Sequence, residues 1–242
     1  MTAPLLVDCY EGDDIKPAAW TTLALVGKPW CGAILKASEG STYKPQWFRD
    51  SWPAVKRGSG PRYGIDWFRG AYHYLRFSSQ PDAQAAAYLA QIDAGGGWSD
   101  GDLWPIVDVE RTGNDGTSKA KVIDYVCRWS AFVLAETGRA PMLYGGSWLR
   151  ELRIKDRMGC QLLWTPRYTA KLPATSYTAL GFDLTSTWGW QYCGDGEAKL
   201  PGYPKATPIG AKLDISAVII NGGSSYEACV TWTRTHLGTR PT

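Results

Sequence analysis

The sequence predicts an α/β protein, a single-domain, TIM-barrel-like (β/α)5(β)3 barrel that takes in residues 1–242. Short apolar runs alternate with amphipathic stretches up to about Lys155, which favours parallel strands joined by right-handed helical crossovers. Three further apolar runs follow with turn-rich connections and little helix between them. No repeat, linker or low-complexity segment marks a second domain, and 242 residues is an ordinary length for one α/β barrel.

Five nearly continuous apolar runs are the strands predicted in the first part of the chain. Such runs are typical of strands whose sheet is covered by helices on its outer face. They span residues 4–8, 33–38, 70–77, 103–110 and 141–145. Two helices are predicted between them. The helix at 80–94 begins beside a proline and runs into three glycines, and the helix at 118–137 has apolar residues at three- and four-residue spacing and stops at Gly138.

The second part of the chain supplies the remaining strands. These are predicted at residues 161–168, 185–193 and 209–216, with a closing helix at 225–237. Five strands followed by three make eight, which is enough to close a small barrel.

Charge and hydropathy exclude two classes of partner. The formal net charge of +3 is small, and residues 150–157 alternate in sign, which is typical of a solvated helix face. Without a basic stripe we expect no nucleic-acid partner. No window reaches the roughly 18 uncharged apolar residues of a membrane span, so we expect no membrane insertion. Residues 1–10 lack the features of a secretory signal, which predicts synthesis in the cytoplasm without a signal peptide.

The cysteines and histidines point to no metal site and no cofactor. Six cysteines are an even number, but no Cys-x-x-Cys pair or cysteine–histidine cluster is present. Buried, reduced thiols are therefore the prediction. The two histidines, His73 and His236, lie far apart in the chain, which argues against zinc.

Four carboxylates are the candidate catalytic groups. Asp108 and Glu110 are two residues apart on a predicted strand, so both side chains point to one face. They end that strand, and Asp8 and Asp214 end two others, where barrel enzymes gather reactive groups. One such acid alone reads as a solvated strand end or a helix cap, but four at matching ends favour a site. Mutual repulsion would raise at least one pKa, and a carboxyl that stays protonated near neutral pH can protonate the leaving oxygen of a glycoside.

Aromatic and amide side chains suggest a sugar site at the same end. The chain has 13 Trp and 13 Tyr but only 5 Phe, and rings with N–H or O–H groups suit sugars. Most of these rings fill the core. The exceptions are Tyr72, Tyr144, Trp164 and Gln191, because they lie on the strands that would frame the barrel mouth.

Two charged or titratable residues in predicted strands have competing explanations. Strand alternation turns His73 to the face opposite Tyr72, so we interpret His73 as a structural hydrogen-bonding residue rather than a general base. Lys36 lies in an otherwise apolar strand, which is costly unless the amine is paired. We expect a carboxylate partner for Lys36 in the acidic mouth.

Segments along nearly the whole chain resemble glycoside hydrolase family 25, the muramidases of bacteria, fungi and phages, in that family's order. The most specific are the Asp-x-Glu pair at 108–110, Lys-Ala-Ser-Glu-Gly at 36–40 and Trp-Gln-Tyr at 190–192. The other matching pieces are Val7-Asp8, Tyr43, residues 70–74, residues 141–144, Leu163-Trp164 with Tyr168, and Asp214. The family's fold, five βα units and three further strands, agrees with the strand count made above.

The resemblance implies that the chain hydrolyses the β-1,4 bond between N-acetylmuramic acid and N-acetylglucosamine in bacterial cell-wall peptidoglycan. The resemblance makes Glu110 the expected general acid. Asp108 would orient the 2-acetamido group of the substrate or stabilise the charge that develops on it. Asp8 and Asp214 would hold the sugar and its oxocarbenium-like transition state. Whether the acetamido oxygen or a protein carboxylate attacks the anomeric carbon stays open, and we favour the acetamido oxygen.

The resemblance also implies sugar contacts for Lys36, Tyr43 and Tyr144. The sequence departs from the family pattern at Tyr10, where Ser is frequent, after Tyr43, where an Asp is common, and after Asp214, where an Asn is frequent. No departure removes a predicted catalytic carboxylate.

Two other functions compete with a muramidase. One is a non-catalytic peptidoglycan-binding barrel of a phage particle, and the other is a chitinase-like glycosidase. Chitinases of that kind carry a longer acidic run before the Glu, whereas residues 104–106 here are Trp-Pro-Ile. The biological setting we expect is a lysin that acts on the wall after holin-assisted release, or one mounted on a virion; a bacterial enzyme exported by a dedicated machine is the alternative.

Overall fold

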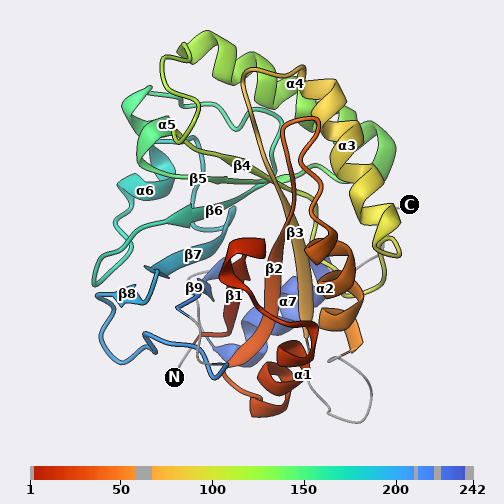
Figure 1. Cartoon of the computed structure of the whole chain (residues 1–242). Coiled ribbons are helices and arrows are strands. Elements are labelled where there is room, and N and C mark those ends of the chain that lie inside the picture. The colour runs from red at the N-terminus through yellow and green to blue at the C-terminus, as the bar shows by residue number, and fades with distance from the viewer. Residues whose placement is uncertain (1–2, 58–66, 210–211, 221–224, 238–242) are drawn as a thin grey trace.

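The computed structural model describes residues 3–57, 67–209, 212–220 and 225–237 (Figure 1). The strands are β1 (Leu5–Cys9), β2 (Trp30–Glu39), β3 (Phe68–Tyr74), β4 (Ile106–Val109), β5 (Met142–Gly145), β6 (Leu162–Pro166), β7 (Thr187–Gly194), β8 (Glu197–Ala198) and β9 (Asp214–Val218). The helices are α1 (Pro17–Val26), α2 (Gln46–Arg57), α3 (Pro81–Ala94), α4 (Lys119–Thr137), α5 (Ser147–Glu151), α6 (Thr175–Thr178) and α7 (Tyr226–Leu237), with a short 3-10 turn at Glu11–Asp13.

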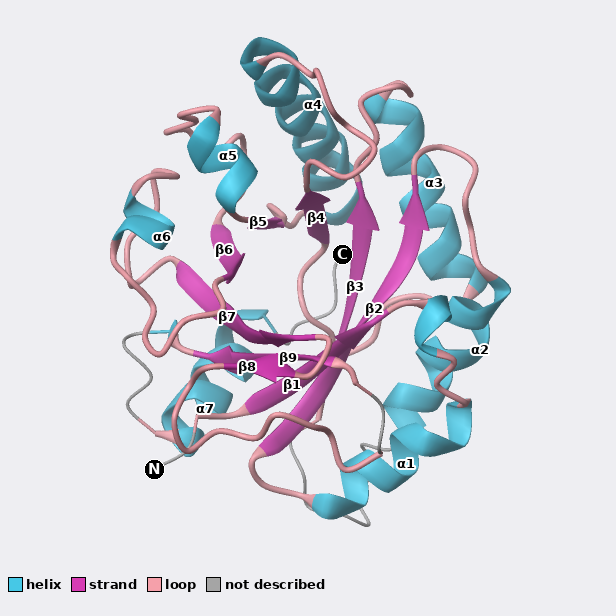
Figure 2. Ribbon diagram, turned by 60° about the vertical axis from the view of Figure 1, so that its left-hand side comes forward, coloured by secondary structure: helices cyan, strands magenta, loops and turns pink. Residues whose placement is uncertain are grey.

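Eight of these strands form a closed barrel. Strands β1 to β7 pair in parallel in chain order, and β9 closes the ring by pairing antiparallel with both β7 and β1. The two-residue β8 only extends β7 as a hairpin. Helices lie outside the ring of strands (Figure 2). The predicted (β/α)5(β)3 barrel is therefore confirmed.

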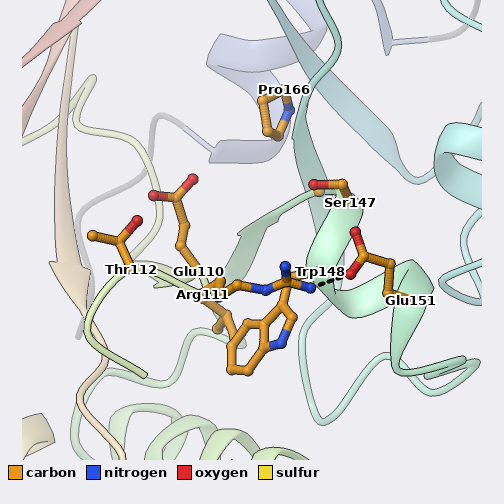
Figure 3. A pocket seen from close by; sticks show the side chains of 9 residues that line it. Glu110, Arg111, Thr112, Ser147, Trp148, Glu151 and Pro166 are labelled. Atoms are coloured by element: carbon orange, nitrogen blue, oxygen red, sulfur yellow. Dashed lines mark hydrogen bonds and ion pairs between the residues drawn. The ribbon is translucent and has the colours of Figure 1, made fainter. Parts of the chain in front are cut away.

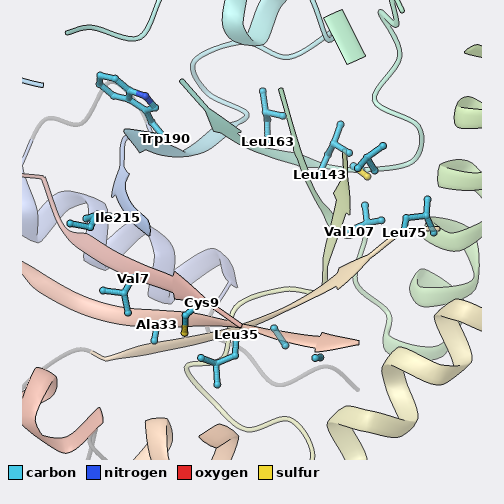
Figure 4. Packing of buried hydrophobic residues seen from close by; sticks show 14 of the residues in the cluster. Val7, Cys9, Ala33, Leu35, Leu75, Val107, Leu143, Leu163, Trp190 and Ile215 are labelled. Carbon is cyan, nitrogen blue, oxygen red and sulfur yellow. The ribbon is translucent and has the colours of Figure 1, made fainter. Parts of the chain in front are cut away.

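Successive side chains of each strand point alternately to the outside and to the inside of the barrel. Outward-facing apolar side chains such as Val7, Val107 and Leu163 pack in one buried cluster with the surrounding helices (Figure 4). The intervening residues Leu6 and Ile106 belong to a second cluster inside the barrel. Because side chains two residues apart share a face, the carboxylates that follow Leu6 and Ile106 by two positions also point inward.

Helix α7 seals the barrel end opposite the strands' carboxyl ends. Its Cys229, Val230 and Leu237 are buried in the inner cluster. Thr233 of the same helix accepts a 3.2 Å hydrogen bond from the indole nitrogen of Trp188, near the start of β7. The interior is thus packed from below.

The predicted helices at 80–94, 118–137 and 225–237 agree with α3, α4 and α7 to within one residue. Ser118 caps α4 by accepting a 3.3 Å bond from the backbone of Lys121, and Gly138 ends it with a φ of 66°. None of the described helices is long and apolar enough to cross a lipid bilayer.

Two local predictions are wrong. The helix face predicted at 150–157 ends at Glu151, because Arg153 takes a φ of 54°, which a continuing α-helix does not allow. The strand predicted at 209–216 begins only at Asp214, and residues 210–211 lie outside the described part of the chain. Asp214 therefore starts a strand instead of ending one. It still reaches the barrel mouth, because β9 runs antiparallel to β1 and its first residue pairs with Asp8.

Candidate active site

A pocket of about 180 Å³ opens at the upper end of the barrel, and every strand of the closed ring contributes to it. Its lining residues are Asp8, Tyr10, Lys36, Tyr72, Tyr74, Asp108, Glu110, Tyr144, Trp164, Gln191 and Asp214. The four predicted carboxylates thus lie together in one pocket, although they come from β1, β9, β4 and the residue after β4.

Gln191 organises one side of this pocket. Its amide nitrogen donates to Asp8 Oδ1 at 3.0 Å and to Asp214 Oδ2 at 3.0 Å. Its amide oxygen accepts from the hydroxyls of Tyr144 and Tyr168, each at 2.8 Å. One buried side chain therefore joins two carboxylates to two tyrosines.

Burial and mutual repulsion hold protons on the Asp8–Asp214 side. Burial is the main cause that raises the pKa of Asp8 well above its usual range, the charge of Asp214 adds to it, and the bond from Gln191 partly offsets both. Burial likewise raises the pKa of Asp214 to about 6, against a bond from the backbone of Asp195 that lowers it. Both shifts favour the protonated forms of these two carboxyls.

Asp108 and Glu110 form the other acidic side. Burial, and then the charge of Glu110, raise the pKa of Asp108 well above its usual range. Burial also raises the pKa of Glu110, while the charge of Lys36 lowers it. Asp108 is only 5% exposed, and its Oδ1 has no hydrogen-bond donor among the described residues. A buried acceptor without a donor costs about 1–3 kcal/mol, so this oxygen is suited to receive one from a ligand.

Lys36 is held in the pocket by a carboxylate that the sequence did not single out for it. Its amine forms an ion pair with Glu39, which Arg76 also pairs with. Burial alone would raise the pKa of Glu39, but these two cations outweigh it and lower the pKa. The amine also lies 4.8 Å from the ring centre of Tyr74. The carboxylate partner expected for Lys36 is therefore Glu39.

Two further cavities adjoin the central pocket at Glu110. The first, about 210 Å³, is lined on its far side by Ser147 and Pro166 and contains the ion pair between Arg111 and Glu151 (Figure 3). The second, about 230 Å³, also includes Glu110, Ser147 and Pro166. Ligand pockets usually have roughly 300–1,000 Å³, which none of the three reaches alone. We therefore treat them as one groove that passes Glu110.

The sequence matches one known protein family over most of its length. The family model described as glycosyl hydrolases family 25 matches residues 7–200. The chain belongs to this family. The sequence resemblance described above is thereby confirmed.

Individual relatives agree with membership of family 25. An N,O-diacetylmuramidase of Chalaropsis sp is 34% identical over 117 residues, 46% of this chain and 53% of that protein. The Escherichia coli K12 protein YegX is 27% identical over 165 residues, 68% of this chain and 53% of YegX. The chain thus spans about half the length of these curated relatives. The bacterial lysozyme of Streptomyces coelicolor has the same fold, with a TM-score of 0.71, 21% identity and coverage of 97% of this chain and 99% of that one.

Among the predicted sugar-contacting residues, Lys36, Tyr72, Tyr144, Trp164 and Gln191 line the central pocket. Tyr43 does not line it. Its hydroxyl bonds to Glu11, and the amine of Lys36 lies 5.5 Å from its ring centre. Tyr43 thus lies beyond Lys36 at the rim, and its sugar contact stays a prediction.

His73 lies on the outer face, as predicted from strand alternation. Its ring nitrogens lie 2.9 Å from Ser38 Oγ and 3.1 Å from Gln84 Oε1, and its ring stacks on Trp129. Burial lowers the pKa of His73 to about 4, so the ring is neutral. His73 is therefore a structural residue.

The described residues contain no cluster of three or more His, Cys, Asp or Glu side chains arranged to hold a metal ion. All six cysteines are unpaired, and five of them are buried.

Sequence reasoning missed several residues of the groove. Tyr74 follows Tyr72 by two positions in β3 and lines the same pocket, so strand alternation could have identified it. Tyr10 was noted only as a departure, yet it lines the pocket as well. Arg150 and Arg167 line one of the adjoining cavities, and no motif signals them.

Proposed function

We propose that this chain is a muramidase that hydrolyses the β-1,4 bond between N-acetylmuramic acid and N-acetylglucosamine in peptidoglycan. Family 25 membership and the N,O-diacetylmuramidase relatives support the substrate class. The observation that carries the proposal is the position of Glu110. Its partly buried carboxyl, with a raised pKa, borders the central acidic pocket and both adjoining cavities. A sugar chain lying in the groove would pass this acid.

Glu110 is the proposed general acid. A carboxyl whose pKa is raised toward neutrality can donate its proton to the leaving glycosidic oxygen and later accept one from water. Lys36 limits this shift, because its positive charge favours the ionised form of Glu110. General acid catalysis of this kind contributes about 10²–10⁴-fold to a rate.

Asp108 is proposed to orient the 2-acetamido group of the muramic acid. Asp108 Oδ1, which has no hydrogen-bond donor among the described residues, would accept the acetamido N–H, and this bond would turn the acetamido oxygen toward the anomeric carbon. That oxygen then forms a bond to the anomeric carbon while the glycosidic bond breaks and Glu110 protonates the leaving oxygen. Water opens the resulting oxazolinium ion, giving its proton to Glu110. This double displacement retains the anomeric configuration, so a product of inverted configuration would exclude the route.

Asp8 and Asp214 are proposed to stabilise positive charge on the ring during the reaction. Gln191 positions both carboxylates from one amide nitrogen. Tyr144 and Trp164, whose ring centres are 4.4 Å apart, would form an aromatic wall for the sugar.

The test is lysis of purified bacterial wall by the wild type and by Glu110→Gln. We expect the substitution to lower the lysis rate by roughly 10²–10⁴-fold. The control is Glu136→Gln, an exposed glutamate of α4, which should leave the rate unchanged. No lysis by either Glu110→Gln or the wild type would favour a barrel that binds wall without cleaving it, and equal, measurable lysis rates would exclude Glu110 as the general acid. Faster release of sugar from chitin oligomers than from peptidoglycan would favour a chitinase-like enzyme.

A further inference from the structure

Two arginines line the cavity on the far side of Glu110. Arg150 belongs to α5, and Arg167 follows β6 by one residue. With Glu110, Ser147, Pro166 and Tyr168 they surround a space of about 230 Å³. Arg150 Nη1 and Arg167 Nε are shielded from solvent and have no hydrogen-bond acceptor within the described part of the chain. Two strong donors are therefore left without partners in a cavity beside the proposed acid.

Their charges are only partly compensated, because the charge of Glu151 acts on Arg150 without forming an ion pair with it. The ion pairs formed between described residues include neither Arg150 nor Arg167. Burial and then the nearby charge of Arg167 lower the pKa of Arg150, so the two guanidinium groups repel each other. Arginine nevertheless stays charged in proteins. By contrast Arg111, in the adjoining cavity, is paired with Glu151. An anion between Arg150 and Arg167 would relieve their repulsion.

The cavity lies on the substrate path but outside the reacting pocket. It shares Glu110 with the central pocket and none of Asp8, Asp108 and Asp214. Figure 3 shows Glu110 facing Ser147 and Pro166 across the first adjoining cavity, and both of these residues also line the cavity of the arginines. A substituent of the wall strand, rather than the ring being cleaved, would reach this position.

We propose that Arg150 and Arg167 bind a carboxylate of the peptide stem carried by a muramic acid, so that the enzyme prefers stem-bearing strands over bare glycan. This inference rests on the proposed function and deepens it. The planar guanidinium fork matches a carboxylate with two parallel hydrogen bonds, and such charge-assisted bonds are among the strongest in proteins. A bare strand offers only the shorter lactyl carboxylate at that sugar.

The test measures release of reducing ends from two substrates by the wild type and by the double variant Arg150→Gln, Arg167→Gln. One substrate is purified peptidoglycan with intact stems. The other is the same material after an amidase has removed the stems and left the lactyl carboxylate. We expect the double variant to raise KM at least tenfold on the stem-bearing substrate, with kcat within about twofold. On the stem-free substrate its kinetics should match those of the wild type. The control Arg128→Gln, in an exposed ion pair of α4 with Asp82, should change neither.

Equal losses on the two substrates would overturn the inference, because the arginines would then serve the glycan, the lactyl carboxylate or the fold. So would an unchanged KM on the stem-bearing substrate.

A folding role is tested separately by urea unfolding. Since removing one of two repelling charges relieves strain, each single variant should unfold at the same urea concentration as the wild type or at a higher one. If the wild type releases no reducing ends from either substrate, the proposed function fails instead. Co-sedimentation with stem-bearing and stem-free wall then still tests the arginines, since the wild type but not the double variant should prefer the stem-bearing wall.

Discussion

Gln191→Met is the most informative single substitution in the pocket. Methionine matches the length of glutamine and has no amide, so Asp8 and Asp214 both lose the donor that lies 3.0 Å from each. A hydrogen bond to a charged group stabilises by about 1.5–3 kcal/mol. At pH 8, above the value of about 6 to which burial raises the pKa of Asp214, this carboxylate is ionised and loses a charged bond. At pH 5 Asp214 holds a proton, and only a weaker bond to a neutral carboxyl is lost.

The sign of the pH dependence follows from these raised pKa values. A carboxyl whose pKa is higher in the folded protein than in the unfolded chain releases its proton more easily on unfolding. Stability is therefore fully present below about pH 4 and is lost as the pH rises through the folded pKa. Removing the amide of Gln191 raises the pKa of Asp8 further, since the bond from Gln191 lowers it in the wild type. Gln191→Met should thus destabilise by roughly 1–1.5 kcal/mol more at pH 8 than at pH 5, the difference between losing a charged and a neutral bond.

The assay is urea unfolding of both proteins at the two pH values. Thr165→Val is a matched control, because Thr165 is buried beside the barrel and its hydroxyl has no partner among the described residues. That substitution should leave stability unchanged or raise it by up to about 1–3 kcal/mol, by the same amount at both pH values. A destabilisation by Gln191→Met that does not depend on pH would refute the assignment of Gln191 as the donor to two ionisable carboxylates.

Three further predictions test other parts of the structure. Lys36→Met removes the charge that lowers the pKa of Glu110, so the limb of the pH–lysis profile set by Glu110 should move to higher pH. His73→Phe should remove part of the pH dependence of stability. Burial lowers the pKa of His73 to about 4 in the folded protein, whereas the unfolded chain takes up the proton near pH 6.5, so acid favours unfolding of the wild type. Between pH 7 and pH 4.5 the wild type should lose roughly 2–3 kcal/mol more than this variant in urea unfolding. Arg69→Met removes the buried cation that pairs with Asp102, which keeps only the more distant amine of Lys56 and bonds from Ser99, and it should cost about 3–5 kcal/mol, measured by the unfolding midpoint.

Exposed counterparts provide the controls for two of these variants. Lys44→Met should leave the pH–lysis profile where it is, because Lys44 is exposed and does not line the central pocket. Arg128→Met breaks an exposed pair and should cost less than about 1 kcal/mol. A profile that Lys36→Met leaves in place would contradict the electrostatic account of Glu110. For His73→Phe the contrary result is an acid sensitivity equal to that of the wild type, and for Arg69→Met it is a cost no larger than that of Arg128→Met.

Much of the barrel could be predicted because apolar runs and helix caps are local signals. Ser118 and Gly138 mark the two ends of α4 in sequence and in structure. Helix α2 was harder to predict, because Pro53 lies inside it and proline usually ends a helix. The start of β9 could not be found from its own residues. Leu213 continues an apolar run, but the strand begins where Asp214 meets its partner across the ring.

The site divides in the same way between local and long-range information. Strand alternation alone was enough to predict that Asp108 and Glu110 point to the same face. The ion pair between Lys36 and Glu39 joins residues three apart in β2, but the pair between Arg76 and Glu39 depends on how β2 lies against the segment after β3, which no short sequence window contains. The cavity of Arg150 and Arg167 likewise forms only when α5 packs beside the end of β6.

Mass analysis of the sugars released from purified peptidoglycan tests the central claim most directly. If four inward carboxylates at the barrel mouth cleave the bond that follows muramic acid, every new reducing end will be N-acetylmuramic acid. Reducing-end N-acetylglucosamine, or intact strands after prolonged incubation with the wild type, would contradict the account.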